Sequence, residues 1–392
     1  MMKEAGLFDS ILAHPDLYEV QIAYTEINRN GKNEPKFKEY HYRVNNDSYF
    51  YPSMAVALPA AVLTIEKINN IAREYEDLKR DSYVRIDTAY RTQTHVFSDK
   101  TSESGKASYS HYIKKMLLIR DKDAYNRAYE FLGQRYFNER MHKLGYRDSW
   151  FLHRLNGDET QESARHTNPV IFFRDDQKAY YRDVIYMKLW PIIIPFTPIY
   201  SQPADYNVLD YYTGRPKILK GNVEINKRLI NSPMDFTYKN RMPINEIHNF
   251  LQSIMFPQTQ KIKLNLTDED YSFLYECMSM CPKNSKYPQY DQDEFPDNHS
   301  KYLAEETIPD YIKIYNNSGQ GFGYMLENAY YTDTRNKVEF LLTVIIRCNK
   351  TEIFADRYYE YETVGRKFIN DLGKTIYNRE LSRSRKNLPI FF

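Results

Sequence analysis

The sequence predicts an α+β fold: one antiparallel sheet of about five strands built from both termini, packed by helices, with a mostly helical domain inserted between them. Two observations lead to this prediction. Alternating runs rich in aromatic and β-branched residues gather near the chain ends, and helical periodicity fills the middle. The predicted domains are therefore 1–75 with 311–392 for the sheet, and 76–310 for the helices. Clustered prolines mark a long, partly irregular insertion at about 170–310.

The first strands are predicted to form a hairpin. Leu17–Asn28 and Phe37–Val44 both alternate, and the segment between them is polar and contains a glycine. A buried helix should follow over Ala60–Tyr75, where leucine and isoleucine recur among many alanines. Pro59 would lie in its first turn, where a missing N–H costs nothing.

Helices are also predicted in the middle of the chain, each from the spacing of its apolar residues. Gly133 is a natural stop for one of them, and Thr267 is a natural N-cap for another because acidic residues follow it. The predicted segments are His111–Ile119, Asp123–Leu132, Ile244–Ile254 and Asp268–Met280.

The C-terminal region is predicted to return to strands before a last helix. The strands are Tyr311–Tyr315, Gly321–Thr332 and Lys337–Arg347, with a turn at 332–336. A helix near Phe354–Tyr377 should then place one apolar face on the sheet, formed by Phe368, Ile369, Leu372 and Ile376.

Composition excludes several classes of protein. Lys+Arg 54 against Asp+Glu 52 leaves a net charge of +2, so no basic field predicts a nucleic-acid partner. The longest apolar run, Trp190–Pro198, is short and broken by prolines, so no transmembrane segment is predicted.

Cys277, Cys281 and Cys348 are expected to be packing residues. Because the sequence starts Met-Met-Lys-Glu-Ala, the protein is expected to be cytoplasmic, or else its export signal lies outside this sequence.

The segment Phe50–Pro59 (FYPSMAVALP) resembles the nucleophile segment of β-lactamase-like and penicillin-binding-protein-like serine hydrolases. It is most similar to the exported Bacteroidetes branch, whose segment reads Tyr-Pro-Ala-Ser-x-x-Lys-Leu-Pro. The resemblance spans nearly the whole chain, with further similar blocks at 20–25, 123–133, 165–169, 234–240 and 316–323. It implies a β-lactamase/transpeptidase-like fold, a serine hydrolase ancestry, and a periplasmic or cell-surface location.

This family's chemistry needs three motifs: Ser-x-x-Lys, Ser-Asp-Asn and Lys-Thr-Gly. In the first, the serine attacks a carbonyl carbon and the lysine, one turn later on the same helix face, influences its proton. When the residues flanking each motif are used to align this sequence with the family, most of the motifs' reactive side chains are replaced by other residues. The positions are Met54 and Ala57, then Arg120-Asp121-Lys122, then Asn317-Ser318-Gly319.

Residues that shape the backbone persist at Pro52, Pro59, Asp121 and Gly319, whereas those that perform chemistry do not. The resemblance therefore implies a catalytically degenerate protein with a binding or scaffolding role. An active hydrolase using non-standard residues is the alternative, with Ser53 or Ser318 as the nucleophile and Lys122 beside it. Ser53 could equally cap the helix. An engineered knockout would usually touch one position rather than five.

Arg120 and Lys122 would return positive charge to the cleft after the loss of the family's two lysines. With Asn317, Ser318 and Gly319 they are the candidate ligand-binding residues, for a peptide or small anionic ligand. The alternative is that both cations pair with neighbouring acids such as Asp121 or Asp123.

No cofactor or metal site is predicted, because the histidines lack metal-ligand spacing. Acids in the loop at 155–162, namely Asp158, Glu159 and Glu162, are expected to be solvated.

Overall fold

The central sheet is six-stranded and antiparallel, with the order β10-β12-β13-β1-β2 and the short β11 pairing with β12. The N-terminal β1 lies beside the C-terminal β13, with Tyr24 opposite Leu342. Strands from the two ends of the chain thus form one sheet, as predicted. Its strands are β1 (Gln21–Arg29), β2 (Pro35–Tyr42), β10 (Ile312–Asn316), β11 (Gly319–Gly321), β12 (Tyr324–Asp333) and β13 (Val338–Arg347).

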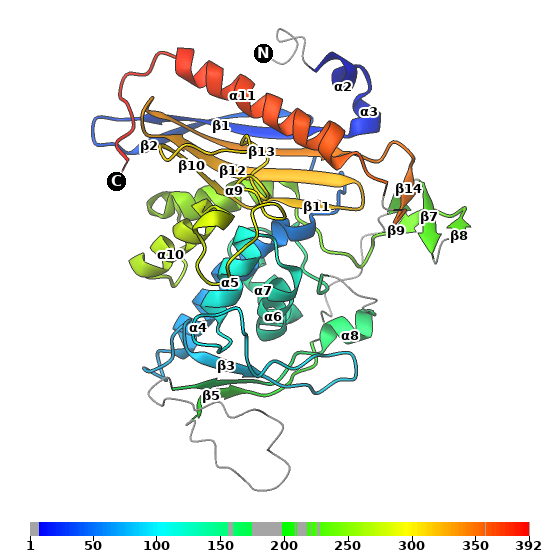
Figure 1. Ribbon diagram of the computed structural model, residues 1–392, viewed down its shortest axis with the longest axis vertical. Coiled ribbons are helices and arrows are strands. Elements are labelled where there is room, and N and C mark those ends of the chain that lie inside the picture. Colours follow the sequence, from blue (N-terminus) through cyan, green and yellow to red (C-terminus); the bar gives the residue numbers. More distant parts are fainter. Residues whose placement is uncertain are drawn as a thin grey trace, which may run out of the picture.

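Helices cover both faces of this sheet in the computed structural model, which describes residues 8–155, 160–174, 198–207, 209, 218–219, 221–225, 228–356 and 358–391. Helix α11 (Lys367–Ser382) packs on one face and α9 (Ile244–Met255) on the other (Figure 1). Every residue of β12 and β13 is therefore buried, and the polar ones among them, such as Glu327 and Thr343, are hydrogen-bonded.

A helical layer lies beyond α9, with α4 (Ala57–Ile71) at its centre (Figure 1). A 3-10 turn at Ser53–Val56 leads into α4, which packs against three neighbouring helices. Residues 57–66 of this helix and Ile68 are buried, as expected for a helix rich in alanine, leucine and isoleucine. The other helices are α5 (Tyr109–Leu118), α6 (Lys122–Leu132), α7 (Gln134–Lys143), α8 (Gln161–Arg165) and α10 (Asp268–Ser279).

Small sheets complete the fold. One is antiparallel and lies at the far end of the helical layer, formed by β3 (Tyr83–Ile86), β4 (Val170–Phe173) and β5 (Pro198–Gln202) (Figure 1). The remaining strands lie in and beside the irregular insertion: β6 (Ile218–Leu219), β7 (Asn222–Ile225), β8 (Arg228–Ile230), β9 (Met234–Asp235) and β14 (Ile353–Phe354). These strands were not predicted from the sequence, because each has only two to five residues and several, such as β3 and β4, pair with partners that are distant in sequence.

Several element boundaries differ from the prediction for identifiable reasons. The chain at Leu17 is still helical, in α3 (Pro15–Tyr18), which follows α2 (Asp9–Ala13). Gly133, at φ +73, ends α6 but also begins α7, a helix that the sequence analysis did not separate. The last helix begins at Lys367 rather than Phe354, because β14 and a π-helical turn at Tyr361–Arg366 precede it.

The predicted helices at 244–254 and 268–280 are present as α9 and α10, and Thr267 caps α10 in a capping box with Asp270. The predicted domain division stays a prediction. Helix α9 lies within 76–310 but packs on the sheet, and α4 lies within 1–75 but packs on the helices.

Candidate functional site

The turn that leads into α4 carries the residues at the expected nucleophile positions, and all of them are buried. Met54 is 2% exposed and Ala57 is 0% exposed, so neither a hydroxyl nor an amine stands at these two positions. Ser53 is 3% exposed and has a left-handed φ of +47. Its Oγ donates to the carbonyl of Gln320, 2.7 Å away, rather than capping the helix.

Strand β11 lies directly against this turn. A Cβ at Gly319 would stand 2.7 Å from the carbonyl oxygen of Pro52, so any side chain here would push the strand off the helix start. Asn317 Nδ2 donates to the carbonyl of Ala55, 2.6 Å away. The first and third motif positions therefore meet in space, but their polar groups are used to hold the two elements together.

The segment His299–Leu303, here called the strap, contacts the last residue of β10, Asn316, and Ser318 just before β11. Ser300 Oγ donates to the carbonyl of Leu118 at the end of α5, 2.7 Å away. The Ser300 carbonyl accepts from Ser318 Oγ at 2.7 Å and from Asn316 Nδ2 at 2.5 Å. The strap thus bridges the helical layer and the sheet edge.

Buried side chains anchor the strap. Lys301 Nζ donates to three oxygens, on Met278 (2.6 Å), Ile314 (2.9 Å) and Asn316 (2.8 Å). Burial lowers the pKa of Lys301 below its ordinary value. Burial also raises the pKa of its neighbour Glu327, although that carboxylate accepts from Asn316 Nδ2 and from the Tyr302 N–H. Such a network is costly to open, because each group would lose its buried partners.

The loop before α6 carries the second motif position. Asp121 caps α6 by accepting from the Ala124 N–H at 3.0 Å, so this retained residue has a structural role. Arg120 donates to the hydroxyl of the fully buried Tyr302 and to the His299 carbonyl, at 3.1 Å for the latter. The Tyr302 hydroxyl in turn donates to Gln320 Oε1, 3.1 Å away. All three motif positions are therefore linked, through the strap and β11.

The acids beside Arg120 and Lys122 have other partners. Asp121 pairs with Lys115 at 3.3 Å, and Asp123 pairs with Arg127 at 3.0 Å. Burial, and secondly the nearby charge of Arg120, lowers the pKa of Lys122. The alternative, in which these two cations pair with Asp121 or Asp123, is therefore not what the structure shows.

Aromatic rings cover the Ser53 side of the helix start. A Cβ at Gly321 would lie 3.1 Å from the Tyr51 ring and 3.2 Å from Ser53 Oγ, so ring and hydroxyl are close. Tyr51 packs edge-on against Phe322 at 4.9 Å, and Phe322 against Phe236 at 5.3 Å. Aromatic rings therefore cover the start of α4 near Ser53. The strap covers the neighbouring edge formed by β10 and β11.

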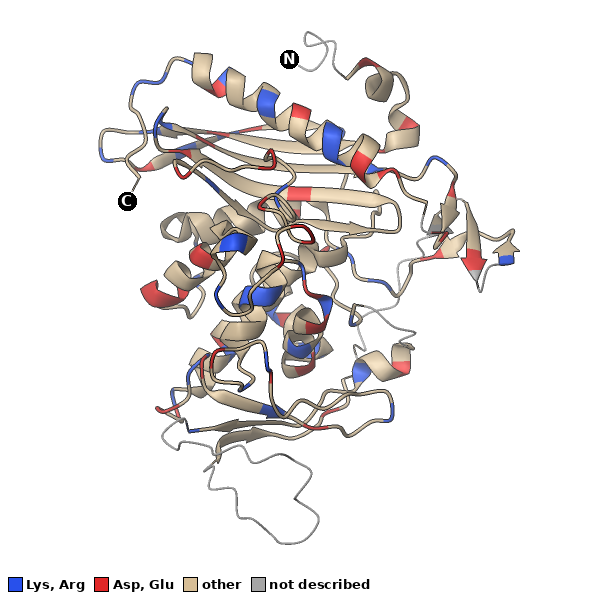
Figure 2. Ribbon diagram, in the orientation of Figure 1, with Lys and Arg blue, Asp and Glu red and all other residues tan. Residues whose placement is uncertain are grey.

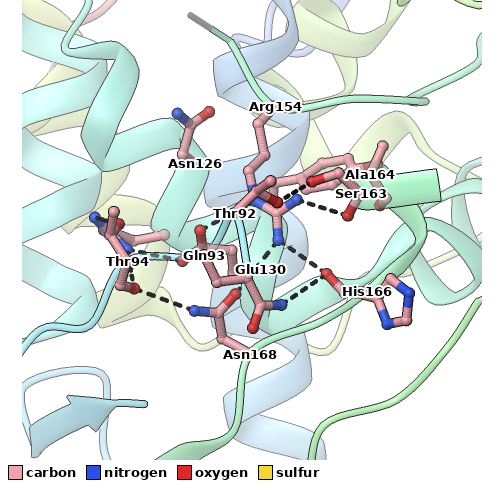
Figure 3. A network of polar contacts seen from close by, with 12 residues as sticks. Thr92, Gln93, Thr94, Asn126, Glu130, Arg154, Ser163, Ala164, His166 and Asn168 are labelled. Carbon is pink, nitrogen blue, oxygen red and sulfur yellow. Dashed lines mark hydrogen bonds and ion pairs between the residues drawn. The ribbon is translucent and has the colours of Figure 1, made fainter. Parts of the chain in front are cut away.

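A second network of charged residues, outside the motif positions, contacts the chain around α8 (Figure 3). Glu130 pairs with Arg127 at 3.1 Å and with Arg154 at 3.0 Å. Arg154 also donates to the His166 carbonyl at 2.9 Å. Burial raises the pKa of Glu130, although both guanidinium groups oppose this.

Of the loop acids, Glu162 accepts from the Tyr206 hydroxyl at 3.0 Å and its side chain is 51% exposed. Asp158 and Glu159 lie outside the described residues.

Within the described ranges, no group of three or more His, Cys, Asp or Glu residues could hold a metal ion. One described helix, Ser53–Ile71, is long and apolar enough to cross a membrane, but 78% of its apolar window is buried in the protein, which is typical of a core helix. The predicted run Trp190–Pro198 falls almost wholly outside the described residues. Cys277, Cys281 and Cys348 are buried thiols, and burial raises the pKa of each.

Solved structures share this arrangement of a terminal sheet, α4 and the helical layer. A β-lactamase from Burkholderia ambifaria superposes with a TM-score of 0.50 at 11% identity, covering 96% of this chain and 99% of that one. This chain has a β-lactamase-like fold. Similar structures with lower TM-scores include the chromosome-encoded β-lactamase of Vibrio parahaemolyticus (0.48, 12% identity, 96% of this chain and 98% of that one). Another is a class A β-lactamase from Mycobacterium abscessus, with a TM-score of 0.47 and 11% identity, covering 95% of this chain and 98% of that one.

No family model and no curated protein matches the sequence. The β-lactamase-like fold agrees with the resemblance found in the sequence, and at this identity the structural likeness concerns the fold alone.

Proposed function

We propose that this β-lactamase-like protein has lost acyl-transfer chemistry and acts as a binding or scaffolding protein. The observation that carries the proposal is the pair Met54 and Ala57 at the start of α4. A thioether has no proton to lose and a methyl group cannot accept one, so this helix start offers neither nucleophile nor base.

The two hydroxyls nearest these positions do not replace the missing groups. Ser53 and Ser318 are 3% and 1% exposed, and both donate to main-chain carbonyls, those of Gln320 and Ser300. An activated serine needs a base as its hydrogen-bond partner and an open approach for the substrate. Both conditions fail for these hydroxyls, which supports the binding role over an active hydrolase using Ser53 or Ser318.

Intact-mass spectrometry after incubation with a penicillin, and separately with a fluorophosphonate, tests the proposal. We expect the mass to stay unchanged with both reagents. A covalent adduct mapped to Ser53 or Ser318 would overturn it in favour of an active serine hydrolase.

A Met54→Ser variant asks how much is missing besides the hydroxyl. We expect this variant also to remain unmodified, because position 54 is buried and Ala57 supplies no base. The unmodified wild type is the control, and circular dichroism checks that the variant is folded. An adduct on the variant alone would show that reagents reach the helix start and that the missing hydroxyl was the sole barrier.

A further inference from the structure

The loop before α6 holds two cations two residues apart whose charge is not balanced locally. The ion pairs of the described residues use Asp121 for Lys115 and Asp123 for Arg127, and they include neither Arg120 nor Lys122. Two like charges held close together in a partly buried position repel each other. A folded protein tolerates this arrangement most easily where a counter-charge binds.

The guanidinium of Arg120 is held in place before any ligand arrives. Its backbone has a left-handed φ of +62, which a residue with a Cβ adopts only when its surroundings enforce it. The side chain lies over the Tyr302 ring, 5.2 Å from its centroid, and donates to neutral acceptors on Tyr302 and His299.

Other charges around Tyr302 add to the positive field. Arg366 approaches the same ring, 4.9 Å from its centroid, and pairs with Glu362, whose side chain is 65% exposed. The buried acid in this area is Glu327, and its carboxylate oxygens accept from Tyr302 and Asn316 on the strap side. The charge of Arg120 opposes the rise in the pKa of Glu327. Within the described residues, however, no carboxylate forms an ion pair with Arg120 or Lys122, so both cations are available to an external partner.

We infer that Arg120 and Lys122 bind an oxyanion, either a carboxylate or a phosphate, with Arg120 as a planar donor and Lys122 as a point charge. This inference rests on the binding role proposed above and names the class of ligand. Arg presents a rigid fork that matches the geometry of both anions, and Lys is a common second contact. The ligand would lie over the loop rather than at the buried helix start.

Titration calorimetry on the full chain at low salt tests the inference with two kinds of probe. One arm uses inorganic phosphate, and the other uses N-acetyl-dialanine with a free carboxylate, compared with its C-terminal amide. We expect saturable binding in at least one arm, with the peptide acid preferred over its amide if carboxylate is the ligand. Arg120→Gln and Lys122→Gln should each weaken binding about tenfold, the usual size of a lost charge-assisted contact.

Lys143→Gln is the matched control, because it removes one exposed positive charge at the end of α7 and should leave affinity unchanged. The inference is overturned if the wild type binds neither phosphate nor the peptide acid, or if Lys143→Gln weakens binding as much as Lys122→Gln. Lys122→Gln removes a half-buried surface charge and remains informative if Arg120→Gln fails to fold. A covalent adduct in the mass-spectrometry experiment would contradict the proposed function, whereas the binding measured by calorimetry would be unaffected. The two failures can therefore be distinguished.

Discussion

Two arginine-centred networks in this molecule differ in how their charge is balanced. Around Glu130, two guanidinium groups share one buried carboxylate (Figure 3), and one of them also pairs with the carboxylate of Asp123. Around Tyr302, the guanidinium of Arg120 meets a phenol, an imidazole and a carbonyl, all of them neutral.

The difference separates a structural role from a binding role. A carboxylate between two arginines costs desolvation but leaves no strong demand for an outside partner, so the Glu130 network fastens the chain around α8. Figure 2 shows basic and acidic residues interspersed over the described elements. Within this part of the chain, Arg120 donates to neutral partners and forms no ion pair. The first network is expected to matter for folding, and the second for what the protein binds.

The largest expected effect comes from breaking the balanced network. Glu130→Gln would leave Arg127 and Arg154 buried without their shared counter-charge, so the free energy of unfolding should fall by about 3–5 kcal/mol. Urea denaturation followed by circular dichroism measures this. A loss below about 1 kcal/mol would show that Glu130 does not balance the two arginines.

A smaller loss of stability is expected from Arg120→Gln. The variant removes hydrogen bonds to neutral acceptors on Tyr302 and His299, worth about 1–2 kcal/mol together, and relieves repulsion with Lys122. The same urea experiment compares it directly with Glu130→Gln. If the two variants lose equal stability, the contrast between the networks fails.

The same substitution should change a titration. Burial, then the charges of Arg120 and Arg366, lower the pKa of His299 from 6.5 to about 4. Between these pH values the unfolded chain binds more protons than the folded protein, so this residue's contribution to stability falls as the pH falls through that window. In Arg120→Gln we expect the pKa of His299 to rise part of the way toward 6.5 and the acid-induced loss to shrink. Proton NMR of the His299 ring follows the shift, and an unchanged pKa would remove Arg120 as a cause.

The smallest effect is expected from Asp123→Asn. Asp123 pairs with Arg127 at the rim of the balanced network, but its side chain is 63% exposed, so solvent screens the interaction. The free energy of unfolding should change by roughly 0.5 kcal/mol or less. A loss comparable to that of Glu130→Gln would mean that the network depends on its rim rather than on its buried carboxylate.

Much of the fold could be predicted because the elements concerned are long and their patterns are local. The hairpin of β1 and β2, the helices α9 and α10, and the Thr267 cap all follow from residues within a few positions of each other. The short strands β3 to β9 could not be predicted in this way. Each has at most five residues, and β3 pairs with a strand far away in sequence. The pair β7 and β8 is local, but both strands are short and β8 is exposed, so neither gives a clear alternating pattern.

The candidate site was predicted in part. The residues that flank the motifs placed Met54 and Ala57 at the start of a helix, where the structure has them. They also identified Asn317, which the structure places between β10 and β11 with its side chain bonded to the helix start. The strap was missed, because His299–Leu303 has no motif and acquires its role through contacts with Leu118, Asn316 and Ser318.

The sequence by itself determined the sheet built from both termini, the apolar core helix that leads from Met54, and the absence of a hydroxyl and an amine at positions 54 and 57, because periodicity and side-chain identity are properties of the chain. Only the tertiary structure decided which polar groups remain to act. The side chains of Ser53, Asn317 and Ser318 donate to nearby main-chain carbonyls, so these donors are already used. Arg120, by contrast, keeps its charge beside neutral acceptors. Hydrogen-bond satisfaction depends on residues that are far apart in sequence, so it could not be determined from local patterns.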